Sequence, residues 1–264
     1  MLFRSTGADS GKGRLPEPTE IFAFAGDILR RVAAGSDPRT RDLTGHRVVV
    51  SAGGTRERLD PVRYLGNRSS GLQGYALART AAARGAEVTL VAANAALADP
   101  AGVKVVRVES TLELRDAVEA AAVGADAVVM AAAPADFRPR HSVEVKIKKA
   151  DDGSAPTVEL VQNPDILAGL VRARAADGRS TPVIVGFAAE TGDDNGGVLD
   201  HARAKLARKG CDLLVVNDVG GGRVFGEPEN EAMILGADGS ATPVPRGSKS
   251  AVADAIWDRV VTLW

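Results

Sequence analysis

Residues 131–149 read Ala-Ala-Ala-Pro-Ala-Asp-Phe-Arg-Pro-Arg-His-Ser-Val-Glu-Val-Lys-Ile-Lys-Lys, and they continue an apolar run that begins at residue 127. We interpret the run as a buried strand, which places Asp136 just past its carboxyl end, where open α/β sheets bind ligands. Three ammonium groups follow, at Lys146, Lys148 and Lys149. Lys146 and Lys148 are two apart, so an extended segment points both to one side. The stretch predicts a polyphosphate site at a sheet edge; a solvated basic hairpin is the alternative.

Strands and helices alternate on both sides of this stretch. We predict strands at residues 47–51, 87–93, 104–108, 127–132, 182–188 and 212–217. The predicted helices span residues 72–84, 112–123, 165–175, 197–209 and 248–263. Two short strands near 143–149 and 157–161 are expected to form a protruding arm, and residues 231–235 and 241–244 a second hairpin. This alternation indicates a doubly wound, mostly parallel, Rossmann-like α/β sheet with a β-hairpin arm.

A different pattern occupies the first 44 residues. Residues 1–18 are rich in Gly, Ser, Pro and charge, so we expect a linker-like or disordered segment. Thr19 is predicted to cap a short helix, in which Ile21, Phe24 and Ile28 recur at helical spacing. A second linker spans residues 35–45. We therefore expect one domain to run from residue 45 to residue 264.

Composition argues against several classes of protein. A formal net charge of −1 over 264 residues disfavours a general binder of nucleic acid or membrane surfaces. The one cysteine, Cys211, excludes an internal disulfide and is predicted to be a core residue, and the three histidines lack the spacing of zinc ligands. No long apolar stretch occurs at the amino terminus. We expect a soluble, cytoplasmic protein.

The Gly-rich loop at residues 51–55, Ser-Ala-Gly-Gly-Thr, is not typical of a dinucleotide site. A dinucleotide fingerprint runs directly into its helix, whereas a charged loop from residue 56 to residue 70 intervenes here. The second strand ends at Asn94, where an NAD site has an acidic residue, and the Walker A spacing is absent. A short-chain reductase is also disfavoured, because neither Tyr64 nor Tyr75 is followed by lysine four residues later.

The helix predicted from residue 72 begins in a setting that favours an anion. It follows Asn67-Arg-Ser-Ser-Gly71, and a helix start offers free backbone N–H groups and a positive dipole end. The plainer alternative is that Ser69 or Ser70 is an ordinary N-cap and that Gly71 and Gly74 serve packing. That alternative leaves the Gly-Gly-Thr loop and the charged insertion unexplained.

Seven motifs, in order, resemble those of the phosphopantothenoylcysteine synthetases, which form the second half of a bacterial bifunctional coenzyme A biosynthesis protein. The resemblance covers residues from about 45 to the end. The motifs are Ser51-Ala-Gly-Gly-Thr55, Asn67-x-Ser-Ser-Gly71, Ala133-x-Ala-Asp136, Lys146-x-Lys-Lys149, Asn163-Pro-Asp-Ile166, Gly186-Phe-Ala-Ala-Glu-Thr191 and Lys205-x-x-x-Lys209. Residues 11–21 resemble the tail of a flavin-dependent decarboxylase. Residues 1–44 would then be a linker and helix left from the junction with that missing domain, and no flavin is expected in this chain.

The resemblance implies CTP-dependent ligation of 4′-phosphopantothenate with L-cysteine. The pantothenate carboxylate would attack the α-phosphate of CTP and give an acyl-cytidylate and pyrophosphate. The cysteine amine would then displace CMP. Mg²⁺ would accompany the nucleotide, with its ligands left open. The resemblance also implies a homodimer in which the arm completes the neighbour's site. The alternative to an enzyme is a regulatory domain that binds a nucleotide but catalyses no reaction.

Catalytic roles are implied for Asn67, which would hold the acyl-cytidylate, and for Lys146, which would neutralise charge during attack on the α-phosphate. The plainer alternatives are a buried structural Asn67, a turn-capping Asp136 and a core Phe187. For Lys205 and Lys209, the plainer alternative is that both lie on an ordinary solvent-exposed face of a helix. The implied nucleotide-binding residues are Gly53, Gly54, Ser69, Ser70, Gly71, Met130, Ala131, Ala132, Asp136, Lys146, Asn163, Pro164, Asp165, Ile166, Phe187, Lys205 and Lys209.

Overall fold

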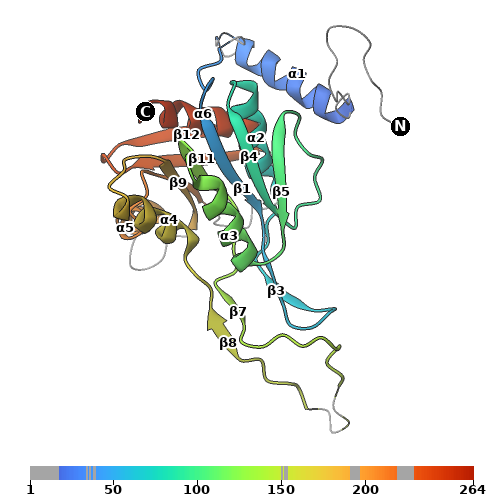
Figure 1. The fold of residues 1–264 in the computed structure, drawn as a ribbon. Coiled ribbons are helices and arrows are strands. Elements are labelled where there is room, and N and C mark those ends of the chain that lie inside the picture. Colours follow the sequence, from blue (N-terminus) through green and yellow to red (C-terminus); the bar gives the residue numbers. More distant parts are fainter. Residues whose placement is uncertain are drawn as a thin grey trace.

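One eight-stranded sheet forms the centre of the fold (Figure 1). The computed structural model describes residues 18–264 except 34, 36, 38, 39, 150, 152, 153, 191–196 and 219–228. The strand order is β12-β11-β10-β9-β6-β1-β4-β5. The strands from β10 to β5 run parallel, and β11 and β12 form an antiparallel hairpin at one edge. The predicted fold class is confirmed. The strand bounds are β1 Arg47–Gly53, β4 Glu87–Ala93, β5 Val103–Val108, β6 Ala127–Met130, β9 Val183–Glu190, β10 Leu213–Asp218, β11 Glu229–Gly236 and β12 Ala241–Ser248.

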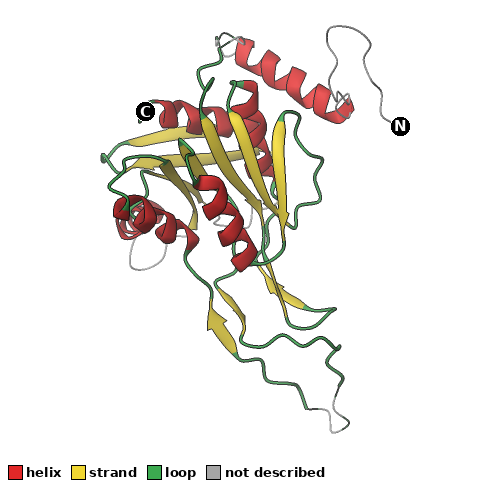
Figure 2. Cartoon of the chain, viewed as in Figure 1, coloured by secondary structure: helices red, strands yellow, loops and turns green. Residues whose placement is uncertain are grey.

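Helices cover both faces of the sheet (Figure 2). On one face lie α2 (Leu72–Ala83) and α6 (Lys249–Val261), and on the other α3 (Thr111–Ala122), α4 (Ile166–Ala176) and α5 (Val198–Lys209). Because the inner strands are buried on both faces, they are apolar almost throughout. Trp257 of α6 is fully buried and donates its indole N–H to the carbonyl of Leu77 in α2 at 3.0 Å. Cys211 is buried in the core of the second face, as predicted, and burial raises the pKa of its thiol to about 11.

The first described helix, α1 (Pro18–Ala33), lies at the end of the molecule away from the arm (Figure 1). The predicted Thr19 cap is wrong, because Thr19 lies inside the helix. Pro18 holds the first position of the described helix, where its fixed φ is already suitable and no backbone donor is needed. Arg30 connects α1 to α6 through an ion pair with Asp254 at 2.7 Å. The predicted linker at residues 1–18 lies almost entirely outside the described residues.

The strand order changes direction between the neighbouring strands β1 and β6. After β1 it passes through α2 to β4 on one side, and after β6 it passes through α4 to β9 on the other. Loops that leave neighbouring parallel strands in opposite directions open a crevice at the carboxyl edge of the sheet. The fold therefore places a crevice between residue 53 and residue 131.

The protruding arm differs from its predicted form. Its strands are β7 (Phe137–Pro139) and β8 (Leu160–Gln162), which pair antiparallel at the base (Figure 1). The strand predicted at 143–149 is wrong, because the backbone there bonds sideways to another loop; the Val143 N–H, for example, donates to the carbonyl of Leu59 at 3.2 Å. That loop joins β2 (Arg56–Arg58) to β3 (Tyr64–Gly66), a hairpin inside the segment predicted to be a charged loop.

Replacement of Gly74 by Ala in α2 should destabilise the fold. An added Cβ would lie 2.5 Å from the Ala52 Cβ and 2.8 Å from the Ser51 carbonyl oxygen, both in β1. We expect Gly74→Ala to lower the free energy of unfolding by about 1–3 kcal/mol through overpacking. Gly169→Ala in α4, where the nearest atoms are 3.9 Å from the new Cβ, should instead stabilise by about 0.5–1 kcal/mol. Urea unfolding measures both; stabilisation by both variants would contradict the close contact between α2 and β1.

Candidate functional site

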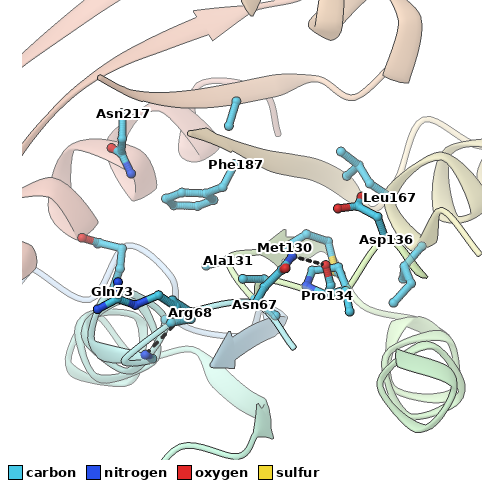
Figure 3. Close-up of a pocket in the computed structure, with 18 of the residues that line it drawn as sticks. Asn67, Arg68, Gln73, Met130, Ala131, Pro134, Asp136, Leu167, Phe187 and Asn217 are labelled. Atoms are coloured by element: carbon cyan, nitrogen blue, oxygen red, sulfur yellow. Dashed lines mark hydrogen bonds between the residues drawn. The ribbon is translucent and has the colours of Figure 1, made fainter. Parts of the chain in front are cut away.

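A cleft of about 550 Å³ opens at the carboxyl edge of the sheet, where the loops after β1 and β6 diverge (Figure 3). Its walls come from the start of α2, the loop after β6 and residues 162–167, with side chains from β9, β10, β11 and α5. The structure brings most of the predicted nucleotide-binding residues together in it. Those that line the cleft are Ser69, Ser70, Gly71, Met130, Ala131, Ala132, Asp136, Asn163, Pro164, Asp165, Ile166, Phe187, Lys205 and Lys209. Asn67, for which a catalytic role was expected, lines it as well.

Hydrogen bonds tie together the two loops that bound the cleft. The Ala133 N–H donates to the Gly53 carbonyl at 2.8 Å, and the Thr55 N–H donates to the Ala133 carbonyl at 3.3 Å. The Thr55 hydroxyl accepts from the Ala135 N–H at 2.8 Å, and the Ser51 hydroxyl accepts from the Ala132 N–H at 3.1 Å. The loops therefore continue the parallel pairing of β1 and β6 for several residues past the sheet.

Gly53 and Gly54 do not line the cleft, and packing explains both glycines. Gly53 has a φ of 84°, and a Cβ there would lie 1.9 Å from the Ala93 carbonyl oxygen. A Cβ on Gly54 would lie 2.3 Å from the Asn67 carbonyl oxygen. Asn94 covers the same turn, since its side-chain amide donates to the Gly54 carbonyl at 2.9 Å. The turn packs directly against the segment that carries Asn67.

The start of α2 faces the cleft without a side-chain cap. Its N-cap is Gly71, at a φ of 77°, so the alternative that Ser69 or Ser70 is the N-cap is wrong. The Ser69 hydroxyl accepts from the Gly71 N–H at 3.3 Å, and the Ser70 hydroxyl accepts from the Leu72 N–H at 3.5 Å. These bonds shape the approach to the helix and leave its positive end at the cleft, where an anion is favoured.

Asn67 lies at the edge of the cleft with an exposed side chain, so the alternative of a buried structural asparagine is wrong. Its amide nitrogen donates to the Pro134 carbonyl at 2.8 Å (Figure 3). A primary amide has two N–H donors and one carbonyl acceptor. The bond to Pro134 uses one donor and fixes the direction of the group against the loop after β6.

Asn163 is a latch between two walls of the cleft. Its side chain is buried; the amide donates to the Ala135 carbonyl at 2.9 Å, and the side-chain oxygen accepts from Arg138 at 3.0 Å. The Asn163 backbone N–H also donates to the Asp136 carbonyl at 2.8 Å. The side chain thus holds residues 163–166 beside the loop after β6.

Two lysines and two carboxylates gather at the wall formed by α4 and α5. Asp165 is the N-cap of α4, accepts from the Ala168 N–H at 3.1 Å and forms an ion pair with Lys209. Partial burial raises the pKa of Asp165, but the bonds from Lys209 and Ala168 outweigh it, so the net pKa lies below the ordinary value. Lys205 lies one turn earlier on α5, on the same side. The exposed carboxylate of Asp136 also lines the cleft, from a residue whose backbone bonds to Asn163.

The opposite wall contains polar residues that the sequence reasoning missed: Arg68, Gln73, Asn217, Asn230 and Lys249; Gln162, next to Asn163, was also missed. Buried Asn230 donates to the side-chain oxygen of Asn217 at 3.1 Å. Gln73 donates to the Lys249 carbonyl at 3.1 Å. Between the two walls lies the half-buried ring of Phe187 (Figure 3). Asn217 ends a predicted strand, and Gln73 lies in the first turn of the anion-favouring helix. Both positions could therefore have been predicted as site residues from the sequence.

Lys146 lies outside the cleft of its own chain. It is exposed on the arm, as is Lys148, and neither contributes to the cleft walls. Among the described residues, no group of three or more His, Cys, Asp or Glu side chains is placed to hold a metal ion. None of the helices that the structure describes is long and apolar enough to cross a membrane.

Residues 43–263 match the family model described as the DNA/pantothenate metabolism flavoprotein C-terminal domain. A coenzyme A biosynthesis bifunctional protein CoaBC from Mycobacterium bovis is 56% identical over 261 residues, which cover 98% of this chain and 61% of the relative. The protein of the same name from Vibrio cholerae is 41% identical over 249 residues, covering 94% of this chain and 58% of the relative. The chain thus spans about three fifths of the length of these relatives.

Solved structures with the same fold include the C-terminal domain of a coenzyme A biosynthesis bifunctional protein CoaBC. It superposes with a TM-score of 0.69 at 33% identity, covering 84% of this chain and 97% of that one. A Cab2 mutant in complex with phosphopantothenate-cysteine superposes with a TM-score of 0.63 over 95% of this chain and 97% of that one. At 15% identity, the Cab2 likeness concerns the fold alone.

Removal of the Asn163 latch should destabilise the cleft walls. Asn163→Ala leaves the buried Ala135 carbonyl without its side-chain donor, and we expect a loss of about 1–3 kcal/mol in the free energy of unfolding. Gln162→Ala, at the exposed neighbouring position, should change it by no more than about 0.5 kcal/mol. Chemical denaturation measures both variants, and equal effects would show that the Asn163 side chain is not a latch.

Proposed function

Because the chain belongs to the family of the DNA/pantothenate metabolism flavoprotein C-terminal domain, we propose that it ligates 4′-phosphopantothenate to L-cysteine with CTP as the activating nucleotide. The observation that carries the proposal is the cleft at the junction of β1 and β6, which unites an uncapped helix start, an oriented asparagine and two lysines. Its setting suits an anionic substrate with several phosphates. The relatives named for coenzyme A biosynthesis support the choice of substrate.

The proposed reaction has two steps. A carboxylate is a poor electrophile, so an oxygen of the pantothenate carboxylate first attacks the α-phosphorus of CTP, and pyrophosphate leaves. The resulting acyl-cytidylate carries CMP as a good leaving group. The cysteine amine, as its free base, then attacks the acyl carbon; the amide forms, CMP departs, and the nitrogen loses a proton. The role of the protein is to position the reactants and to stabilise charge.

The nucleotide is proposed to lie between the loop after β6 and residues 163–166. Phe187 would flank the base, and backbone groups of residues 163–166 would contact it. Lys205, Lys209 and the positive end of α2 would face the phosphates. Lys209 is already paired with Asp165, so phosphate would compete with that carboxylate for the ammonium group.

Mg²⁺ fits this arrangement as a companion of the nucleotide. It keeps several waters and is commonly held by one or two carboxylates together with substrate phosphates. Asp136 offers an exposed carboxylate inside the cleft, whereas Asp165 is occupied by Lys209 and the Ala168 N–H. We propose Asp136 as its protein contact. When bound, the ion would neutralise charge on the phosphates.

A homodimer is the proposed assembly, because Lys146 lies outside the cleft of its own chain. The arm exposes apolar side chains that suit burial against a second copy; they are Phe137, Val143, Val145, Val158 and Leu160. The arm of one copy would then bring Lys146 to the cleft of the other.

The ligase domain is proposed to span residues 45–264, in a cytoplasmic protein. Residues 1–44 would be the junction to a flavin-dependent decarboxylase domain, which would hold the flavin. Helix α1 exposes Phe22 (81%) and Leu29 (69%), as expected of a helix that packs against a further domain.

Pyrophosphate release in the presence of CTP, 4′-phosphopantothenate and cysteine tests the proposed function. The ligase produces pyrophosphate that depends on both CTP and 4′-phosphopantothenate. A regulatory nucleotide-binding domain would be stabilised by CTP in a thermal-shift measurement yet release no pyrophosphate. Stabilisation by NADH alone would contradict the proposal and favour a reductase.

Lys146→Ala should slow the first step. Removal of one well-placed electrostatic partner of a transition state costs about 10²–10³ in rate, so pyrophosphate formation should fall by that factor. Arg140→Ala removes another exposed arm cation, paired with Glu159 at 2.7 Å, and should leave the rate within about two-fold. A near wild-type rate for Lys146→Ala would make Lys146 a solvated surface charge.

Asn67 should separate the two steps. A neutral amide adds little to the binding of a polyanion, so Asn67→Asp should still consume CTP slowly. At the acyl oxygen, where negative charge builds as cysteine attacks, a carboxylate repels instead of donating a hydrogen bond. We expect the variant to accumulate the acyl-cytidylate, detected by mass spectrometry of a quenched reaction, and to form little product at saturating cysteine. Loss of ligation without any intermediate would contradict this role.

A further inference from the structure

A buried carboxylate contacts the arm and does not line the cleft. Asp60 is in the loop between β2 and β3, and its side chain is fully buried, with 0% exposed. One of its oxygens accepts from the N–H groups of Val62 and Arg63, both at 2.8 Å, and closes the turn. The other accepts from the Ile147 N–H of the arm at 3.1 Å and pairs with the Arg63 guanidinium at 3.0 Å. The carboxylate thus joins two segments that are distant in sequence.

The same pair of residues holds both sides of Ile147. While Asp60 accepts from the Ile147 N–H, Arg63 donates to the Ile147 carbonyl at 2.6 Å. The Val143 N–H, four residues earlier, donates to the Leu59 carbonyl at 3.2 Å. These bonds replace the cross-arm pairing that the segment would make as a strand. Its register is therefore set by the loop between β2 and β3.

We propose that Asp60 and Arg63 are positioning residues that fix the backbone between Lys146 and Lys148 and so deliver Lys146 to the nucleotide. This inference rests on the proposed function. A lysine side chain is long and flexible, so a fixed backbone is needed if its ammonium group is to reach a transition state reproducibly. In a dimer, the clamp formed by Asp60, Arg63 and Ile147 would make the arm and the β2–β3 hairpin one unit that enters the neighbouring cleft.

Turn formation alone does not account for Asp60. The turn uses one carboxylate oxygen, and the second oxygen serves the arm and Arg63. A carboxylate withdrawn from water is destabilising unless donors surround it. Burial raises the pKa of Asp60, but the three N–H donors and the Arg63 charge outweigh this and hold the pKa below its usual range. The clamp is thus ionised at neutral pH.

Asp60→Asn tests the clamp with little change in shape. An amide oxygen can still accept from the N–H groups of Val62 and Arg63, which keeps the turn. Its NH₂ group would then face the Ile147 N–H and the Arg63 guanidinium, so donors would face donors. We expect pyrophosphate formation to fall by about 10- to 100-fold. Glu159→Gln, which makes the same change in an exposed arm ion pair, should stay within about two-fold.

A double-mutant cycle separates positioning from general damage. If Asp60 acts through Lys146, the double variant Asp60→Asn/Lys146→Ala should be no slower than Lys146→Ala alone. Multiplied losses would overturn the inference. Arg63→Lys, at a partly exposed position, keeps the charge but loses the planar fork; it serves as the second variant if Asp60→Asn does not fold, and the same non-additivity is expected.

Hydrogen exchange at the Ile147 amide tests the clamp without the reaction. We expect protection in the wild type and exchange at least about ten-fold faster in Asp60→Asn, with little change in core amides. Equal exchange in both proteins would overturn the clamp. If exchange behaves as expected but the wild type releases no pyrophosphate, the proposed function and the positioning role fail together while the clamp itself stands.

Discussion

The loops after β1 and β6 remain hydrogen-bonded to each other after their strands have ended, and the cleft depends on this pairing. The Thr55 hydroxyl reaches the Ala135 N–H, and the backbone of Ala133 bonds to both Gly53 and Thr55. Since the two connections leave the sheet in opposite directions, a crevice forms beside the pairing. Asn67 and the start of α2 follow from one loop, and Asp136 and the Asn163 latch from the other. A slip of either loop would separate these groups.

The cleft and the arm have separate roles in the proposed reaction. The cleft groups are held by short bonds within one chain, as at Asn163 and Asn67. The arm, in contrast, projects from the domain (Figure 1). It also exposes apolar side chains along its length. If the loop between β2 and β3 holds the arm in register, as we propose, a second chain need only receive a preformed surface. Such preorganisation lowers the entropic cost of bringing a lysine to the phosphates.

The sequence predicted the parallel sheet well because its inner strands are continuous apolar runs and several of its helices begin at clear capping residues. Asp165 and Ser248, for instance, are the observed N-caps of α4 and α6. The cleft followed from the same logic, since polar residues after neighbouring strands meet at one edge. The arm was less predictable: residues 143–147 bond to the loop at 59–63, a tertiary choice that no local pattern shows. Asn230 was missed for a similar reason, because only sheet pairing brings it to Asn217.

In the proposed reaction, this cleft activates a carboxylate by transferring a nucleotide to it. The most direct measurement uses 4′-phosphopantothenate labelled with oxygen-18 in its carboxylate, with CTP and cysteine, and mass spectrometry of the nucleotide product. Attack on the α-phosphorus predicts that one labelled oxygen appears in CMP and that the other stays in the amide. Label in inorganic phosphate, with CDP as the nucleotide product, or unlabelled CMP, would contradict nucleotide transfer to the carboxylate.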